Sequence, residues 1–229
     1  MEQNPFTGAE PGFAENPEPR CASVLLLDVS GSMAGAPLQQ LQEGLAVYKD
    51  ELFADSLARK RVEIAIVTFG GLVQVAQAFT TAEYFTPPTL VATGETPMAA
   101  AVITALDLLR SRKDEYKTHG IGYYRPWVFL ITDGAPTDMN TPQWTDAVAR
   151  VRDGEDKKAF SFFAVGVEGA DFERLRELSP KRDPLKLKAL RFRDLFVWLS
   201  SSQQTVSRSK PDDAVPLTNP ASPEGWATV

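Results

Sequence analysis

The sequence is poor in the side chains that form disulfides and zinc sites. Its 229 residues include one cysteine, Cys21, and one histidine, His119. A single cysteine excludes an internal disulfide and agrees with a reducing compartment. With so few sulfur and imidazole ligands, a zinc centre is not expected. His119 lies in a polar stretch, and we assign it no direct role.

Long apolar runs and basic clusters are absent as well. No segment approaches the roughly 18 apolar residues that cross a bilayer, so we expect no membrane contact. The first 20 residues lack the basic start and apolar core of a signal peptide. The net charge is -6 with no block of Lys and Arg, which argues against a nucleic-acid partner. These absences predict a soluble, cytoplasmic protein.

Proline, glycine and acidic residues are concentrated at the two ends of the chain. We therefore predict a flexible segment over residues 1–20, one domain over 21–208 and a tail over 209–229. Two alternatives stay open for the tail, which is either unattached or docked on the domain. The side chains that would dock it are the bulky ones: Trp226, Leu217 and Val215.

Strand and helix patterns alternate along the domain. An apolar stripe spaced like one face of a helix follows Pro37: Leu38, Leu41, Leu45, Tyr48 and Leu52. Near-continuous apolar runs, typical of strands covered on both faces, occupy residues 23–29, 61–70, 125–134 and 159–167. Further helix patterns occupy residues 96–113, 141–155, 171–178 and 192–209.

One strand pattern follows the preceding strand directly, with no helix pattern between them. Residues 72–80 follow the preceding strand across Gly70-Gly71, which indicates a hairpin, and residues 184–190 resemble a short edge strand. The order of elements predicts the α/β class, with a single doubly wound, mostly parallel sheet. One antiparallel edge strand and helices on both faces complete the expected fold.

Two apolar strands end in a carboxylate. Asp28 closes "SVLLLD" and Asp133 closes "WVFLITD". In open α/β sheets, ligands bind beyond the carboxyl ends of the strands, where both acids lie. A half-buried carboxylate is costly unless it is paired or bound to a cation. We therefore rank these two above the other acids of the chain.

Hydroxyl groups accompany both acids. Ser30 and Ser32 alternate with Asp28 on the turn after the first strand, and Thr96 precedes a helix pattern. Such an oxygen-only ligand set suits Mg²⁺, with Mn²⁺ or Ca²⁺ as alternatives. The competing interpretation is helix capping, by Ser30 or Ser32 and by Thr96. Asp138 is a further candidate carboxylate, although a turn or capping role fits it better.

The pieces "DVSGSM", "TGETPM" and "ITDG" resemble the metal-ion-dependent adhesion site of von Willebrand factor A domains. The resemblance covers about residues 22 to 200. It implies a divalent cation held, directly or through water, by one set of residues: Asp28, Ser30, Ser32, Thr96 and Asp133. It also implies a partner protein whose Asp or Glu completes the ion's coordination shell.

Four further stretches carry a closer resemblance: "RVEIAIVTFGG", "YYRPWVFLITDGAPTD", "FFAVGVEGADFERL" and "LFVWLSSS". They resemble the TerY-type proteins of bacterial tellurium-resistance operons. This likeness implies a cytoplasmic bacterial protein of a stress-response system. It also implies partners of the same operon, namely a protein phosphatase or a protein kinase.

The predicted function is therefore metal-dependent protein binding without catalysis. Two alternatives stay open: Mg²⁺-dependent phosphoryl transfer or phosphatase-type chemistry, and a metal-independent scaffold. Against catalysis, "DVSGSMAG" lacks the lysine of a phosphate-binding loop, and Ser30 stands where an aspartyl-phosphatase loop has a second aspartate. No histidine lies near either acid in the sequence.

Two segments are candidate partner-binding surfaces. The connection "EYKTHGIGYYRPW" contains aromatic residues of the type that anchor interfaces. Its candidates are Tyr123, Tyr124 and Tyr116, whereas Trp127 is expected to begin a strand and pack in the core. The second candidate is the rim over residues 85–94, where Pro87-Pro88 stiffens the approach to Thr96.

Overall fold

A computed structural model describes residues 12–211, 213, 215–222 and 225–228. The strands are β1 (Cys21–Asp28), β2 (Val62–Gly70), β3 (Leu72–Thr81), β4 (Trp127–Thr132), β5 (Ser161–Gly166), β6 (Leu185–Leu187) and β7 (Ala227–Thr228). The helices are α1 (Ala36–Ala54), α2 (Ala58–Arg61), α3 (Met98–Thr118), α4 (Pro142–Asp156), α5 (Phe172–Leu178) and α6 (Phe192–Arg208), with a 3₁₀ turn, η1 (Gly31–Met33).

The strands form a single mixed sheet in the order β3-β2-β1-β4-β5-β6-β7. Neighbours from β2 through β6 run parallel, as the alternation of strands and helices predicted. β3 is antiparallel to β2, as the Gly70-Gly71 hairpin predicted. The sequence did not predict β7, which is antiparallel to β6 and places a second antiparallel pair at the other edge. With only two residues, β7 is too short to show a strand pattern.

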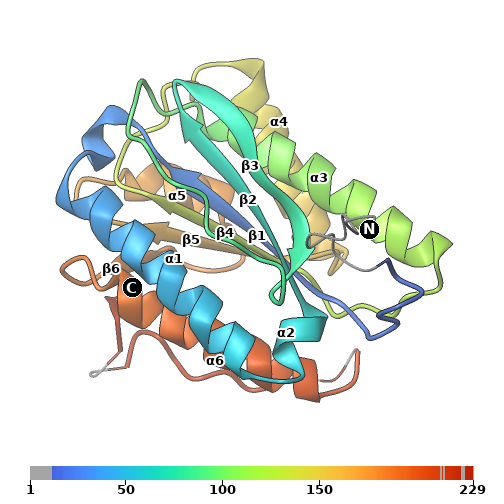
Figure 1. The fold of residues 1–229 in the computed structure, drawn as a ribbon. Coiled ribbons are helices and arrows are strands. Elements are labelled where there is room, and N and C mark those ends of the chain that lie inside the picture. Colours follow the sequence, from blue (N-terminus) through green and yellow to red (C-terminus); the bar gives the residue numbers. More distant parts are fainter. Residues whose placement is uncertain (1–11, 212, 214, 223–224, 229) are drawn as a thin grey trace, which may run out of the picture.

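Helices cover both faces of the sheet (Figure 1), which confirms the doubly wound fold. α1 and α6 pack on one face, and α3, α4 and α5 pack on the other. β1 contributes alternate residues to the two cores: Leu25 and Leu27 face α1, while Val24 and Leu26 face α3. None of the helices in the described part of the chain combines the length and hydropathy that a bilayer crossing requires.

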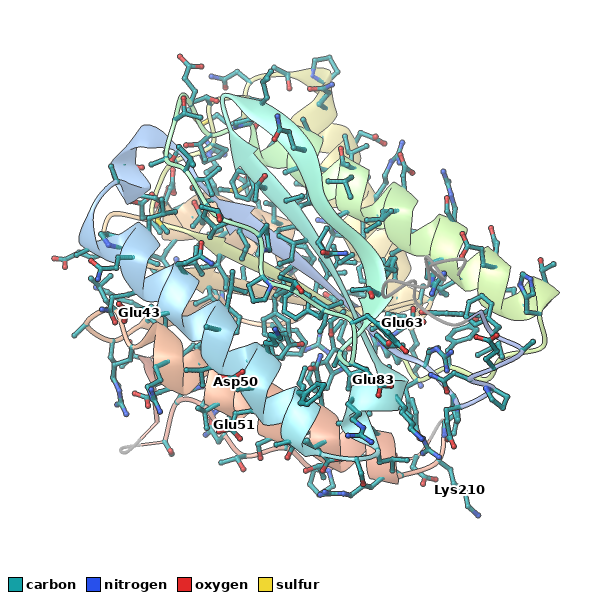
Figure 2. All side chains as sticks on the ribbon, in the orientation of Figure 1. Glu43, Asp50, Glu51, Glu63, Glu83 and Lys210 are labelled. Atoms are coloured by element: carbon teal, nitrogen blue, oxygen red, sulfur yellow. The ribbon has the colours of Figure 1, made fainter. Side chains whose placement is uncertain are left out.

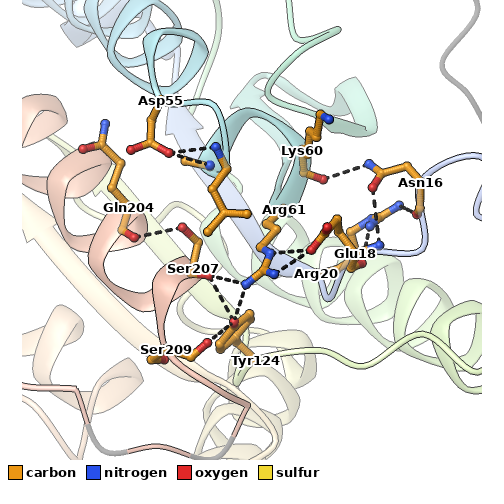
Figure 3. A network of polar contacts seen from close by, with 12 residues as sticks. Asn16, Glu18, Arg20, Asp55, Lys60, Arg61, Tyr124, Gln204, Ser207 and Ser209 are labelled. Carbon is orange, nitrogen blue, oxygen red and sulfur yellow. Dashed lines mark hydrogen bonds and ion pairs between the residues drawn. The ribbon is translucent and has the colours of Figure 1, made fainter.

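The segment before β1 lies against the domain, in contrast to the flexible segment expected over residues 1–20. Residues 1–11 fall outside the described residues. From Gly12 onward, polar contacts hold the chain in place: Asn16 Nδ2 donates to Lys60 O at 3.0 Å, and Glu18 pairs with Arg61 at 2.6 Å. Figure 3 shows Arg61 between Glu18 and the carboxyl-terminal end of α6. These contacts with distant residues hold the segment in place. The composition of the segment predicted flexibility because composition carries no information about such contacts.

A buried ion pair anchors the same segment to the sheet. Glu63 of β2 is 0% exposed and accepts from Arg20 Nε at 2.8 Å and from Arg112 Nε at 2.8 Å. Tyr116 donates its hydroxyl proton to the same carboxylate at 2.5 Å. Figure 2 shows Glu63 near the end of the sheet where α2 leads into β2. A buried carboxylate of this kind is stable only because several donors surround it.

The described part of the tail is docked on the domain. Trp226 is 3% exposed, and its ring lies 5.7 Å from that of Trp198 on α6. Leu217 packs against the core beneath α1 and α6. The backbone of β7 pairs with β6, and Lys188 N donates to Trp226 O at 2.9 Å. The docked alternative is therefore the arrangement that the structure has.

We expect Trp226→Ala to lower the free energy of unfolding by about 3 kcal/mol, because it removes a large buried side chain. Val197→Ala on the exposed side of α6 is the control, since Val197 is 38% exposed. Urea unfolding followed by circular dichroism measures both. Equal stability of Trp226→Ala and the parent protein would contradict tail docking.

Cys21 is predicted to be unreactive in the folded protein. Burial raises the pKa of its thiol to about 12. Because the thiolate is the reacting form, alkylation by iodoacetamide at about pH 8 is expected to be slowed on the order of a thousandfold. Mass spectrometry measures labelling with and without guanidinium. Equally fast labelling in both conditions would contradict the buried position.

Candidate metal centre

The register of β1 against β4 brings the two strand-end acids together. The strands are parallel, and Leu27 lies opposite Ile131. Asp28 is the last residue of β1, and Asp133 immediately follows β4. Both carboxylates are buried, with 0% and 9% of their surface exposed. The sequence prediction that these acids share one end of the sheet agrees with this geometry.

The serines of the first motif reach across to the second acid. Ser30 Oγ lies 3.0 Å from Ser32 Oγ, and Ser32 Oγ donates to Asp133 Oδ1 at 2.7 Å. Ser30 N donates to Asp28 Oδ1 at 2.8 Å, which fixes the turn after β1. Ser30 is buried, whereas Ser32 is exposed. The cluster therefore has an inner side in the protein and an outer side that faces solvent.

Thr96 completes the cluster from a different loop. An atom placed at the Cβ position of Gly134 would lie 3.3 Å from Thr96 Oγ1, 3.8 Å from Asp28 Oδ2 and 3.8 Å from Ser32 Oγ. Side-chain oxygens from two separate loops thus face a small space beside Gly134, which lies in a third loop. The other two residues that the sequence singled out, Ser30 and Asp133, join the cluster through Ser32.

The rim over residues 85–94 holds Thr96 at the centre through backbone contacts. Thr93 N donates to Val29 O at 2.8 Å, and Gly31 N donates to Gly94 O at 3.0 Å. The side chain of Gln42 on α1 forms two hydrogen bonds with the rim: it donates to Pro88 O at 3.1 Å and accepts from Leu90 N at 2.9 Å. In this structure, the rim positions a candidate ligand.

Helix capping does not account for these hydroxyls. Within the described residues, neither Ser30 before η1 nor Pro97 before α3 has a side chain that caps its helix. Asp138 caps α3 instead, because its carboxylate accepts from Ala99 N and Ala100 N, both at 3.1 Å. Asp138 therefore has the capping role that its sequence position favoured. Ser30 and Ser32 direct their hydroxyls at each other and at Asp133.

Sequence reasoning missed two supporting residues, Thr132 and Gly134. Thr132 is 0% exposed and donates its hydroxyl proton to Asp28 Oδ2 at 2.5 Å. Gly134 N donates back to Thr132 Oγ1 at 3.1 Å. A side chain at Gly134 would project into the space between the oxygens. The available signal was a hydroxyl and a glycine on either side of Asp133, at the end of an apolar strand.

The electrostatics of the cluster favour a cation. Burial raises the pKa of Asp28, and the charge of Asp133 raises it further, while hydrogen bonds from Ser30 and Thr132 oppose the rise. A divalent cation would remove the repulsion between the two carboxylates. In the part of the chain that the structure describes, no three His, Cys, Asp or Glu residues group to hold a metal. The hydroxyl-rich set with two carboxylates therefore fits a hard cation such as Mg²⁺ better than zinc.

The tyrosine segment differs from its expected form. α3 continues to Thr118 instead of ending near Lys113, so Tyr116 lies on the helix and is 0% exposed. Tyr124 is 3% exposed, and its hydroxyl donates to Ser209 O at 2.6 Å (Figure 3). Both side chains belong to the interior and are unavailable as surface anchors. Tyr123 is partly exposed and stays a candidate contact residue.

Trp127 begins β4 and is buried, as expected. His119 follows α3, and its ring lies 5.0 Å from that of Phe13. It is thus beyond the carboxyl-terminal end of α3, whereas Thr96 precedes the amino-terminal end of the same helix.

The sequence model of the von Willebrand factor type A domain matches residues 24–195, so the chain belongs to this family. The matched region contains all five residues of the candidate centre. Domains of this family commonly bind a divalent cation. A comparison with curated proteins found no match.

Solved structures share the fold. The pilus adhesin SpaC of Lactobacillus rhamnosus GG aligns with a TM-score of 0.64 and 12% identity, over 82% of this chain and 31% of its own. Proximal thread matrix protein 1 of the mussel byssus gives 0.54 and 16%, over 81% and 48%. The PilB minor pilin of Streptococcus sanguinis gives 0.51 and 12%, over 81% and 62%. This chain spans less than two thirds of each protein, and these identities establish a shared fold alone.

We expect Thr132→Val to weaken Mg²⁺ binding at this centre about tenfold, because it keeps the shape of the side chain but removes the hydrogen bond that orients Asp28. Isothermal titration with MgCl₂ measures the affinity. Thr104→Val is the matched control, since Thr104 bonds only its own helix through Ala100 O at 2.8 Å. An unchanged affinity in Thr132→Val would show that Thr132 does not orient a ligand.

Proposed function

We propose that this chain is a protein-binding module whose contact with its partner depends on a divalent cation. Asp28, Ser30, Ser32, Thr96 and Asp133 would hold the ion, with Mg²⁺ the best fit to their oxygens. The observation that carries the proposal is the convergence beside Gly134 of oxygens from the loops of Asp28 and Thr96, with Asp133 joined to them through Ser32. Membership of the von Willebrand factor type A family supports it.

The cation would supply an electrophilic centre at the protein surface. The two carboxylates balance its charge formally, and hydroxyls are neutral ligands, so the ion keeps affinity for one more anionic oxygen. The exposed position of Ser32 leaves the outer side of the cluster accessible. An Asp or Glu of a partner protein is the proposed last ligand, and its charge gives the contact specificity.

The resemblance to TerY-type proteins suggests where the module acts. We propose a role in a bacterial tellurium-resistance or stress-response system in the cytoplasm. The proposed partners are a protein phosphatase or a protein kinase of the same operon. This assignment rests on the sequence likeness.

Catalysis is not proposed. The carboxylates at the centre accept hydrogen bonds from Thr132 and Ser32, and the chain's one histidine lies beyond the far end of α3. Phosphoryl transfer would require a nucleophile or base and a phosphate cradle in addition to the ion. A metal-independent scaffold is the remaining alternative, and the experiment below separates it from the proposal.

The first measurement is the thermal stability of the purified protein with and without Mg²⁺. A cation at about 100 times its dissociation constant adds about 2.7 kcal/mol of stability to the folded state. We expect Asp28→Asn to abolish this gain and Asp50→Asn to keep it, because Asp50 is an exposed residue of α1 (Figure 2). Mn²⁺ and Ca²⁺ are tested in parallel.

The second measurement is capture of partners from the native cell lysate. The baits are the parent protein in Mg²⁺, the parent protein in EDTA and Asp28→Asn in Mg²⁺. A partner retained only in the first condition supports cation-dependent binding. A partner retained in all three conditions favours the scaffold alternative, even if Mg²⁺ stabilises the protein.

A further inference from the structure

A cavity lies at the opposite end of the sheet from the candidate metal centre. Its volume is about 540 Å³, which is in the range of sites for small organic molecules. Arg125 and Trp127 reach it from the start of β4, and Lys158 and Ser161 from the start of β5. Tyr124 and Phe163 extend these two walls, and the remaining residues come from three other segments: Arg182, Val206, and the tail with Asp213, Val215 and Leu217. The amino ends of the strands thus form this cavity, whereas their carboxyl ends form the metal centre.

Three cations line the cavity, and only one has a carboxylate partner among the described residues. Arg182 pairs with Glu155, which is buried. Arg125 donates from Nε to Phe160 O at 2.7 Å but forms no ion pair in the described ranges, and neither does Lys158. Asp213, on the rim, uses its carboxylate to accept from Lys210 N at 2.8 Å. Among the described residues that line the cavity, three cations thus face one acid, Asp213, which leaves a surplus of positive charge.

Partial burial makes the charge of Arg125 costly, whereas Lys158 is exposed. Burial lowers the pKa of Arg125 and the nearby charge of Arg182 lowers it further, while the charge of Glu155 opposes the shift. Like charges held together with fewer counterions than cations destabilise a fold, so such an arrangement points to a function. An anion entering the cavity would neutralise the cluster.

The end of α4 places Lys158 beside the cavity. Lys158 has φ of 54°, a left-handed conformation that favours glycine or asparagine. Lys158 N donates to Glu155 O at 3.0 Å, which fixes this turn after α4. A left-handed residue at this point is a common helix ending, and it limits which substitutions position 158 tolerates.

The apolar walls of the cavity are packed against their neighbours. Trp127 is 6% exposed, and its ring lies 5.8 Å from that of Phe163. The hydroxyl of Tyr124 donates to Ser209 O just beyond α6 (Figure 3). This hydrogen bond holds the last turn of α6, which contains Val206, beside the cavity. Such a site contacts an apolar group over most of its surface and an acidic group at one side.

We propose that this cavity binds a small amphipathic organic anion. The acidic head group, a carboxylate or a phosphate, contacts Arg125 and Lys158. The apolar body lies against Trp127, Val206 and Leu217. This site is separate from the metal centre, so its occupancy does not require a divalent cation.

The test measures binding of three eight-carbon probes by isothermal titration in the presence of EDTA: octanoate, octyl phosphate and the neutral octanol. We expect at least one of the two anions to bind at least about tenfold more tightly than octanol, because charged hydrogen bonds require the head group. The arm that binds more tightly identifies the head group. Octanol binding as tightly as both anions, or no binding of either anion, would overturn the proposal.

Variants of the two unpaired cations locate the binding site. Lys158→Asn removes the charge and keeps a residue that tolerates the left-handed conformation, so we expect it to fold and to bind the anions at least about fivefold more weakly. Lys157→Asn is the matched control, because the adjacent Lys157 pairs with Asp153 at 2.7 Å and does not line the cavity. Arg125→Met, checked for folding by circular dichroism, removes the second cation. Equal loss in Lys157→Asn and Lys158→Asn, or no loss in Lys158→Asn, would overturn the assignment.

Discussion

The parallel pairing of β1 with β4 is the constraint on which the candidate centre depends. Leu27 lies opposite Ile131, so the residues after them, Asp28 and Thr132, lie side by side. Ser32 and Asp133, 101 residues apart in the chain, then come within hydrogen-bond distance. A shift of one residue in this register would turn Asp28 and Thr132 to opposite faces, because side chains alternate along a strand. The apolar residues that fix the register of β1 against β4 thereby also position the polar residues of the candidate centre.

The two ends of the sheet have different chemistry. At the carboxyl ends, oxygens from three loops converge with a net negative charge. At the amino ends, Glu63 is enclosed by Arg20, Arg112 and Tyr116, and a separate cavity carries unpaired cations. The Glu63 cluster is fully satisfied and ties the segment before β1 to β2 and α3. In the cavity Arg182 pairs with Glu155, but among the described residues Arg125 and Lys158 form no ion pair, which is why the cavity is a candidate binding site while the Glu63 cluster is structural.

Much of the fold could be read from local patterns. Apolar runs located the central strands, because strands covered on both faces need continuous apolar sequence. The candidate ligands were also local signals, since an acid that closes an apolar strand is unusual. The predictions were wrong where contacts between distant segments determine the structure. Tyr116 was predicted to lie in a loop, but α3 continues past Lys113, because Tyr116 finds the buried Glu63 carboxylate as its partner.

The sequence by itself determined the order of strands and helices, apart from α2 and β7, and the five oxygen-bearing residues, because periodicity and strand ends are properties of neighbouring residues. Only the tertiary structure decided that the tail docks through Trp226, that Thr132 orients Asp28, and that Arg125 and Lys158 share a cavity. Each of these depends on contacts between segments distant in the chain. Such contacts are fixed by the packing of the whole sheet, and no local pattern records them.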